Sequence, residues 1–157
     1  MNTRTLTAAN AVLTLSVAGL YDTPRQIEGF SSDDVTDSGS IDTAETSMGV
    51  DGRLSAGWLA VEIMQTITLQ ADSLSNDFFE NWRQAEAQVR EKYVASGTLI
   101  IPATGRKYAM TRGFLKGVAP FGAVRKTLQP RAYTITWESI SAAPTPGFNP
   151  GFVSAFI

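Results

Sequence analysis

The clearest pattern in the sequence is an alternation of apolar and polar side chains over residues 58–69. The odd-numbered positions are almost wholly apolar, whereas the even-numbered positions include Glu62, Thr66 and Thr68. Successive side chains of a β-strand point to opposite faces, so this alternation predicts a strand whose odd-numbered side chains lie in a core. A similar alternation over residues 132–140 predicts a second strand of the same kind.

The spacing of apolar side chains changes after residue 72. They then recur every three or four positions, at Leu74, Phe78, Trp82, Ala85, Val89 and Tyr93. This spacing predicts an amphipathic α-helix at about residues 75–94, with Ser75 or Asn76 at its start and Ser96 and Gly97 as the signal that ends it. A single amphipathic helix has to bury its apolar stripe, so we expect it to pack on a sheet.

The remaining strands are predicted from shorter apolar segments, at residues 5–20, 98–102 and 107–118. Residues 24–52 are polar and lack a helical period, so we expect a long polar hairpin with its bend near residues 37–40. Asp51 and Gly52 give a second turn signal. Together these elements predict a mainly β fold: an antiparallel β-sandwich or barrel with one flanking α-helix and a protruding polar hairpin.

The chain has 157 residues, which suits one domain with a substantial core. We therefore expect a single domain over residues 1–157. Residues 141–157 would form a C-terminal extension that carries no charged side chain and contains Phe148, Phe152 and Phe156. Such an apolar segment is expected to dock, either on its own subunit or on a neighbour.

Two missing residue types narrow the chemistry. The chain has no Cys and no His, which excludes disulfides, thiol nucleophiles, Cys/His zinc sites and histidine acid–base catalysis. The acidic stretch at residues 33–45 lacks both the EF-hand pattern and the aromatic side chains of a glycosidase cleft. We therefore predict no enzymatic activity, no metal and no cofactor. No stretch approaches the ~18 apolar residues of a membrane-spanning helix, so no membrane partner is expected.

Charge is divided unevenly along the chain, although the net charge is only −2. Residues 22–62 hold nine acidic and two basic residues, a balance of −7, whereas residues 83–131 hold ten basic and two acidic residues, a balance of +8. Chance exposure on loops is the plainer explanation. The alternative is that one copy's basic surface faces another copy's acidic surface, or that the acidic surface faces something that must not bind.

Basic and aromatic residues are mixed at residues 105–117, as they would be in a nucleic-acid-binding patch. No signature of a known nucleic-acid-binding module accompanies them. We therefore favour a β-hairpin with its basic residues on the outer face, or a surface that contacts protein.

Two segments carry a resemblance to a known family. Residues 54–85, LSAGWLAVEIMQTITLQADSLSNDFFENWRQA, lead from a strand directly into the helix, and residues 112–139, RGFLKGVAPFGAVRKTLQPRAYTITWES, place a basic segment before a closing strand. With the polar hairpin, this order resembles the tail tube proteins of long-tailed bacteriophages over residues 5–140. The family is similar in fold to the tube protein of the type VI secretion system.

The resemblance implies a structural virion protein. Members form homohexameric rings that stack into a hollow tube, through which DNA leaves during ejection without specific binding. The implied partners are other copies of the chain, together with sheath, tape-measure, baseplate or tail-terminator proteins. The implied location is the virion tail, assembled in the host cytoplasm.

The resemblance also suggests roles for the charged residues. A basic channel would hold DNA through its phosphates, so an acidic, hydroxyl-rich lumen is expected. The lumen-lining candidates, on the wall or at the ring-to-ring seam, are Asp33, Asp34, Asp37, Asp42 and Glu45. The candidates for subunit or inter-ring contacts are Arg106, Lys107, Arg112, Lys116, Arg125, Lys126, Phe148, Phe152 and Phe156.

Other functions remain open at this point. A bacterial secretion tube or a tail-like bacteriocin tube would share the same fold. A monomeric β-barrel that binds a ligand is an alternative from a different class, and it would have a closed apolar pocket. A carboxylate hydrolase is disfavoured because the acidic stretch has few aromatic neighbours.

Overall fold

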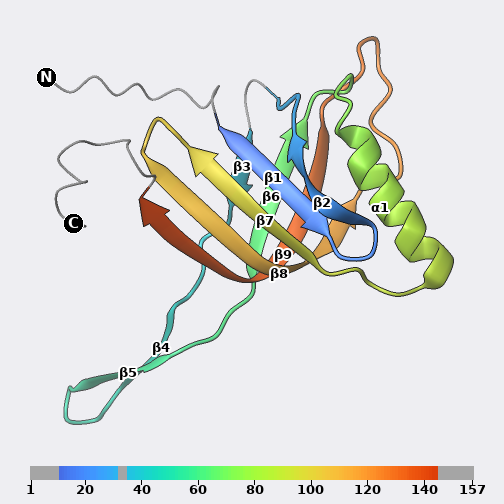
Figure 1. The fold of residues 1–157 in the computed structure, drawn as a ribbon. Coiled ribbons are helices and arrows are strands. Elements are labelled where there is room, and N and C mark those ends of the chain that lie inside the picture. The colour runs from blue at the N-terminus through green and yellow to red at the C-terminus, as the bar shows by residue number, and fades with distance from the viewer. Residues whose placement is uncertain (1–10, 32–34, 145–157) are drawn as a thin grey trace, which may run out of the picture.

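A computed structural model describes residues 11–31 and 35–144 (Figure 1). The elements, in chain order, are β1 (Val12–Val17), β2 (Tyr21–Ile27), β3 (Thr36–Ser38), β4 (Ala44–Met48), β5 (Leu54–Trp58), β6 (Ile63–Leu69), α1 (Asn76–Val89), β7 (Ala95–Ile101), β8 (Arg106–Val118) and β9 (Arg131–Pro144).

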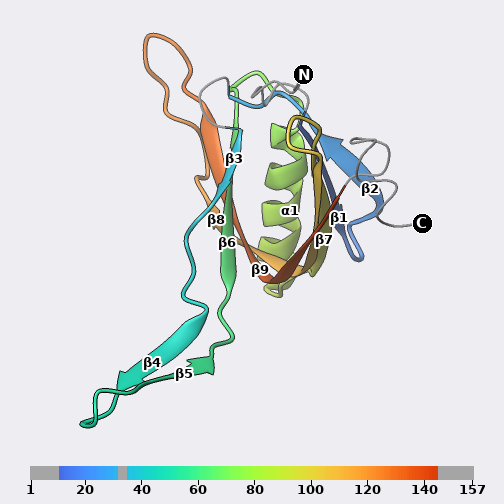
Figure 2. The same ribbon diagram turned by 90° about the vertical axis from the view of Figure 1, so that its left-hand side faces the viewer.

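Seven strands form one antiparallel sheet in the order β2-β1-β7-β8-β9-β6-β3, and β4 pairs only with β5. The large sheet curves around α1, so that β2, β1 and β7 form one wall and β9, β6 and β3 form the other (Figure 2). The mainly β, sandwich-like fold with one helix is confirmed. The sheet does not close into a barrel, because β2 and β3 lie at its two ends.

The core lies between the two walls and the helix. The buried side chains of β1 are Leu13, Leu15 and Val17, at every second position, as the pleat of a strand requires. Aromatic residues of α1 reach both walls. The Phe78 ring stacks on Tyr21 of β2 with the ring centroids 4.5 Å apart, and the Phe79 ring stacks on Tyr133 of β9 at 4.2 Å. The helix therefore joins the two walls.

A chain of polar contacts fixes the short strand β3 to its neighbours. Trp137 Nε1 donates a hydrogen bond to Gln65 Oε1 at 2.9 Å, and Gln65 Nε2 donates to Thr36 Oγ1 at 2.9 Å. Thr36 Oγ1 in turn donates to the Thr66 carbonyl at 3.0 Å. Gln65 and Trp137 are buried, so these bonds replace contacts with water that both side chains have lost. These hydrogen bonds hold β9, β6 and β3 together near the point from which the chain continues to β4.

The helix is shorter than the apolar spacing predicted. It ends at Val89, and Arg90 adopts a left-handed conformation with φ 54°. The physical reason is Glu86, whose buried carboxylate accepts hydrogen bonds from Lys92 Nζ and from the backbone N–H of Tyr93, both at 2.9 Å. These bonds hold the chain in a turn after Arg90. Ser96 and Gly97, expected to end the helix, lie in β7 instead.

The buried stripe of the helix also differs from the predicted one. Phe78 and Trp82 are buried as expected, but Leu74 is 87% exposed and precedes the helix. Phe79 and Glu86 are buried in addition to them. The predicted stripe differs from the buried one because it was drawn from the large apolar residues alone. It therefore left out Glu86, whose buried carboxylate has two hydrogen-bond partners.

The bend of the polar hairpin was predicted at the wrong place. Asp37 and Ser38 lie in β3, paired with Thr66 and Gln65 of β6. The turn lies at residues 49–52, where the Gly49 N–H donates to the Arg53 carbonyl at 2.9 Å and Gly52 has φ 81°. The Asp51-Gly52 signal was therefore the correct one, because Gly52 supplies the positive φ that this turn uses and glycine adopts it without steric cost.

The predicted strand over residues 58–69 is divided in two. Trp58 ends β5, whereas β6 begins only at Ile63. Within β6 the expected alternation is confirmed, because Gln65, Ile67 and Leu69 are buried. The strand predicted over residues 5–20 corresponds to β1, which covers Val12–Val17. Residues 5–10 lie outside the described part of the chain.

Candidate assembly surfaces

The hairpin β4–β5 is a two-stranded ribbon with two different faces. Opposite pairs share a face: Ala44 with Trp58, Thr46 with Ala56 and Met48 with Leu54 on one side, and Glu45 with Gly57 and Ser47 with Ser55 on the other. One face is therefore mostly apolar and the other polar. The prediction of a polar hairpin missed the apolar face, because its members are spread over both strands and meet only after pairing.

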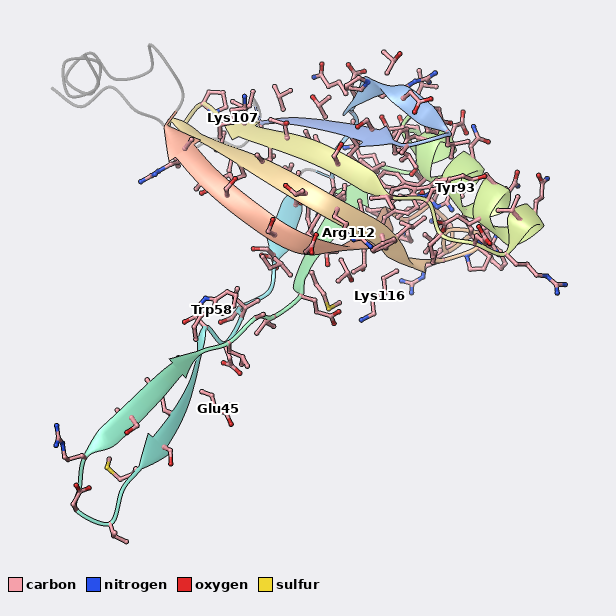
Figure 3. All side chains as sticks on the ribbon, turned by 60° about the horizontal axis from the view of Figure 1, so that its bottom comes forward. Glu45, Trp58, Tyr93, Lys107, Arg112 and Lys116 are labelled. Carbon is pink, nitrogen blue, oxygen red and sulfur yellow. The ribbon has the colours of Figure 1, made fainter. Side chains whose placement is uncertain are left out.

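The apolar face of the hairpin is bare. The side chains of Met48, Leu54 and Trp58 are 65%, 64% and 85% exposed, and every residue from 39 to 60 is exposed. The hairpin projects from the body on the side away from α1, and Glu45 and Trp58 both lie on it (Figures 1 and 3). Isolated two-stranded hairpins are marginally stable in water, so a covering partner would stabilise this one.

A second projecting segment is the loop between β8 and β9, residues 119–130. Its exposed side chains include the apolar Phe121, Val124 and Leu128 and the basic Arg125 and Lys126. The loop and the hairpin project at opposite ends of the same wall of the molecule (Figure 2). The chain thus presents an apolar and acidic projection at one end and an apolar and basic projection at the other.

The outer face of the wall formed by β9, β6 and β3 points away from α1, and we call it the helix-free face (Figure 2). Asp37, Thr66 and Thr134 form one row across its three strands. Met64 and Thr136 form a neighbouring row. Asp37, Met64 and Thr66 are exposed on this face, whereas Thr134 and Thr136 are partly buried and the Thr136 hydroxyl is shielded from water. The helix-free face therefore carries both polar and apolar side chains.

The acidic candidates are divided between two places. Asp37 lies on the helix-free face, opposite Thr66. Asp42 precedes the hairpin and Glu45 lies on its polar face, and both are exposed. Asp33 and Asp34 lie outside the described residues.

The basic candidates of β8 are spread along the strand. Lys107 lies near one end of β8 and Lys116 near the other, with Arg112 between them (Figure 3). The Arg112 guanidinium lies 4.0 Å from the Glu138 carboxylate, and Lys116 Nζ lies 3.7 Å from that of Glu62. These pairs are exposed and contribute little to stability, but each places opposite charges side by side.

The other contact candidates fall elsewhere. Arg106 is exposed at the start of β8, beside the β7–β8 turn. Arg125 and Lys126 lie on the β8–β9 loop. Phe148, Phe152 and Phe156 lie outside the described residues.

The described residues offer no group of three or more Asp or Glu side chains placed to hold a metal ion. None of the helices in that same part of the chain is long and apolar enough to cross a membrane.

Burial raises the pKa of Tyr133 to about 12, but its hydroxyl lies in the core and donates a hydrogen bond to Asn76 Oδ1 at 2.8 Å. This tyrosine is therefore part of the fold. The surfaces above are suited to assembly.

Comparisons with known proteins give a matching family model and several solved structures of similar fold. The family model described as "Tail fiber protein gp32" matches residues 4–141. None of the curated proteins matches the chain.

Among solved structures, a chain of the six-fold symmetrised cryo-EM structure of the anti-feeding prophage (AFP) baseplate has a TM-score of 0.60 at 6% identity, covering 93% of this chain and 99% of that chain. A chain of the AFP tube terminating cap has a TM-score of 0.59 at 12% identity, covering 92% and 95%. A chain of the PVC sheath–tube complex, from an extracellular contractile injection system, has a TM-score of 0.53 at 12% identity, covering 85% and 88%.

At these identities the structural likeness establishes the fold, and it confirms the tail-tube-like fold that the sequence resemblance implied. The family match covers most of the chain and comes from the sequence itself. The chain therefore belongs to the tail fiber protein gp32 family.

Proposed function

We propose that this chain is the tube subunit of a phage tail: homohexameric rings stack into a hollow tube that conducts DNA during ejection. The observation that carries the proposal is the projecting β4–β5 hairpin, whose apolar face with Met48, Leu54 and Trp58 is bare. Exposed apolar surface on a projecting element is a feature of interaction sites. Other copies of the chain are present wherever a tail component assembles, so a second copy is the expected partner.

Ring closure would use the two ends of the sheet. Strands β2 and β3 have no neighbour on their outer sides among the described residues. Free edges invite uncontrolled pairing, and a closed ring of copies removes them. The six-fold symmetry in the description of the AFP baseplate structure, one chain of which shares this fold, supports six copies per ring.

In this assembly the helix-free face lines the bore. The opposite face of the same strands is occupied by the core and α1, so only the outer face is free. Thr66 is exposed and offers its hydroxyl to water, and the Asp37 carboxylate repels phosphates. Basic side chains would hold the duplex by releasing counterions.

Two bases of β8 that the sequence assigned to subunit or inter-ring contacts also bear on the charge of the bore. Arg112 and Lys116 each have an acidic partner, Glu138 and Glu62 respectively. A base that is paired with a carboxylate attracts phosphate less than a free base does. Where these pairs approach the bore, they therefore add little attraction for DNA.

Stacking of rings would use the two projections. The hairpin, with Asp42 and Glu45, would lie at the ring-to-ring seam and meet the β8–β9 loop of a copy in the next ring, where Arg125 and Lys126 offer the opposite charge. Because the projections lie at opposite ends of one wall, such contacts run head to tail and lead to a filament. Charge complementarity would set the register of the rings more than their affinity.

The wider context follows from the tail assignment. The tube subunit would lie in the virion tail after assembly in the host cytoplasm. Its partners would include sheath, tape-measure, and baseplate or tail-terminator proteins. A bacterial secretion tube or a tail-like bacteriocin tube would use the same surfaces and is the remaining alternative within this class.

The experiment that tests the proposal removes the apolar face of the hairpin. The variant Leu54→Ser with Trp58→Ser keeps the polar face and the turn intact. Electron microscopy of the purified wild type should show hollow filaments, and the variant should give single rings or monomers. Ser55→Ala, on the polar face, is the matched control and should assemble like the wild type.

Two results would contradict the proposal. One is a wild-type protein that stays monomeric at high concentration, as a ligand-binding barrel would. The other is a variant that forms filaments as readily as the control. Size-exclusion chromatography with light scattering separates these outcomes.

A further inference from the structure

A groove opens at the end of the core that α1 does not cover. Its volume is about 450 Å³. Six apolar side chains from both walls of the sheet line it: Ile63, Leu99, Ile101, Tyr108, Met110 and Ile140. Thr36, Asp37, Ser38 and Gly39 form a mostly polar rim where the chain leaves the body for the hairpin, and Ile41 adds an apolar side chain to this rim. Cavities that bury a small ligand measure roughly 300–1,000 Å³, so the groove can hold a few large side chains.

We propose that residues 145–157 of the same chain fill this groove. The segment contains three phenylalanines, Phe148, Phe152 and Phe156, and ends on Ile157. It has no charged side chain, so its docking would take no side-chain charge out of water. Both the groove and the segment would otherwise present apolar surface to water, and contact between them would be favoured by about 25 cal/mol per Å² of apolar surface buried.

The position of the last described residue supports a contact within one chain. Strand β9 ends at Pro144, which pairs with Arg106 beside the β7–β8 turn. Ile140, four residues earlier on the same strand, lines the groove. Pro146 and Gly147 come two and three residues after Pro144, and both residue types favour the turn that would lead the chain back to the groove. The thirteen remaining residues can span ~3.3–3.6 Å each, which is ample for the return.

The amino-terminal segment fits the groove less well. It precedes β1, whose first residue Val12 pairs with Ile100, so it also starts near this end of the sheet. Residues 1–10 contain Arg4 and are otherwise mostly small or polar, with Leu6 as the one aliphatic residue of large size beyond Met1. The carboxyl-terminal segment is therefore the better match to an apolar groove.

A docked segment would also act on the hairpin. Gly39 and Ile41 belong to the rim of the groove and lie between β3 and the hairpin. A side chain seated in the groove would pack against them and limit the directions in which the hairpin can point. The segment would thus orient the hairpin, whether or not the chain assembles into rings.

Engineered cysteine pairs test the proposal directly, because the chain has no Cys of its own. Ile41→Cys, at a position that is 39% exposed on the rim, is combined in turn with Phe148→Cys, Phe152→Cys and Phe156→Cys in the full-length protein. The control places the first cysteine at Val89, which is 54% exposed at the end of the helix. Mild oxidation is followed on denaturing gels without reductant.

We expect at least one rim pair to form a cross-linked monomer at least ten-fold faster than its Val89 control, at a rate independent of protein concentration. Equal rates for the rim and control pairs would overturn the proposal. Cross-linking that gives mainly covalent dimers would overturn it too, because the segment would then fill a neighbour's groove. Filament formation is scored separately by microscopy, so a failure of tube assembly does not affect this result.

A second full-length variant guards against disturbance by the cysteines. Phe148→Ser, Phe152→Ser and Phe156→Ser together should empty the groove and raise the fluorescence of an apolar dye several-fold over the wild type. Unchanged fluorescence, with unchanged circular dichroism, would contradict the proposal.

Discussion

At the scale of single residues, the fold depends on close contacts that leave no room for additions. Gly113 of β8 lies directly against the Trp137 ring, and a Cβ at this position would overlap the indole. Trp137 is fully buried and bonded to Gln65, so it cannot turn away without loss. The sequence offers no local sign of this constraint, because Gly113 and Trp137 meet only through strand pairing.

Gly113→Ala should therefore destabilise the protein by about 1–3 kcal/mol, the usual cost of overpacking a core. Gly57→Ala is the matched control: Gly57 also lies in a strand, and a Cβ there would meet nothing within 4 Å. Urea unfolding followed by tryptophan fluorescence measures both variants. Equal stabilities of the two would show that the indole can move aside.

Tyr133 gives the fold a defined response to alkaline pH. Burial raises its pKa from 10.0 to about 12. Above pH 10 the unfolded chain releases this proton while the folded protein still holds it, so rising pH favours unfolding. The stability that depends on this group is complete below pH 10 and is lost by about pH 12, with a total of about 2–3 kcal/mol.

Tyr133→Phe should remove that part of the pH dependence. It should also cost about 1–2 kcal/mol at neutral pH, because Asn76 Oδ1 loses its buried donor. The measurement is the free energy of unfolding of both proteins at pH 8 and pH 11. If the two proteins lost equal stability between these values, Tyr133 would not be the responsible group.

At the scale of elements, the regular parts of the fold could be predicted and their ends could not. Alternation identified β6 and β9, and the helical period identified α1, because these elements bury one face each. The end of α1 depends on the buried Glu86 and on its bonds to Lys92 and Tyr93, which no periodicity encodes. The hairpin was predicted, but its turn was misplaced, since two turn signals competed and β3 formed by pairing with a distant strand.

The root of the hairpin makes a testable case at this scale. Gln65→Leu removes the link between Trp137 and Thr36 and leaves the Trp137 N–H buried without a partner, at a cost of about 1–3 kcal/mol. Hydrogen exchange at residues 36–38 should accelerate more than exchange in β1. Gln70→Leu, at an exposed position, is the control. Uniform acceleration over the whole sheet would argue against a local role for the link.

At the scale of the whole molecule, the sequence supplied the class of fold but only part of the candidate surfaces. The charge asymmetry was visible, and the structure places Asp37 on the helix-free face, Asp42 before the hairpin and Glu45 on it. The apolar face of the hairpin, the paired bases Arg112 and Lys116, and the groove all arise from tertiary contacts. Such features bring together residues that are far apart in sequence, so local sequence patterns do not predict them.

The proposed bore predicts a functional phenotype for a single charge. Asp37→Lys places a base on the helix-free face without disturbing the core, because Asp37 is exposed. Particles with this variant should assemble in normal numbers but deliver DNA at least ten-fold less often, since six added cations per ring would bind phosphates. Asp37→Asn is the control for loss of the negative charge alone. Normal infectivity of the lysine variant would place Asp37 away from the DNA.

The most direct test of the central claim is a high-resolution cryo-EM map of the purified wild-type protein after assembly. We expect stacked six-membered rings, with the helix-free face of β3, β6 and β9 toward an open bore and α1 away from it. Each hairpin should lie across the seam to the next ring. A monomer with its hairpin folded back on its own body, or a tube with α1 toward the bore, would show that the proposed tube is wrong.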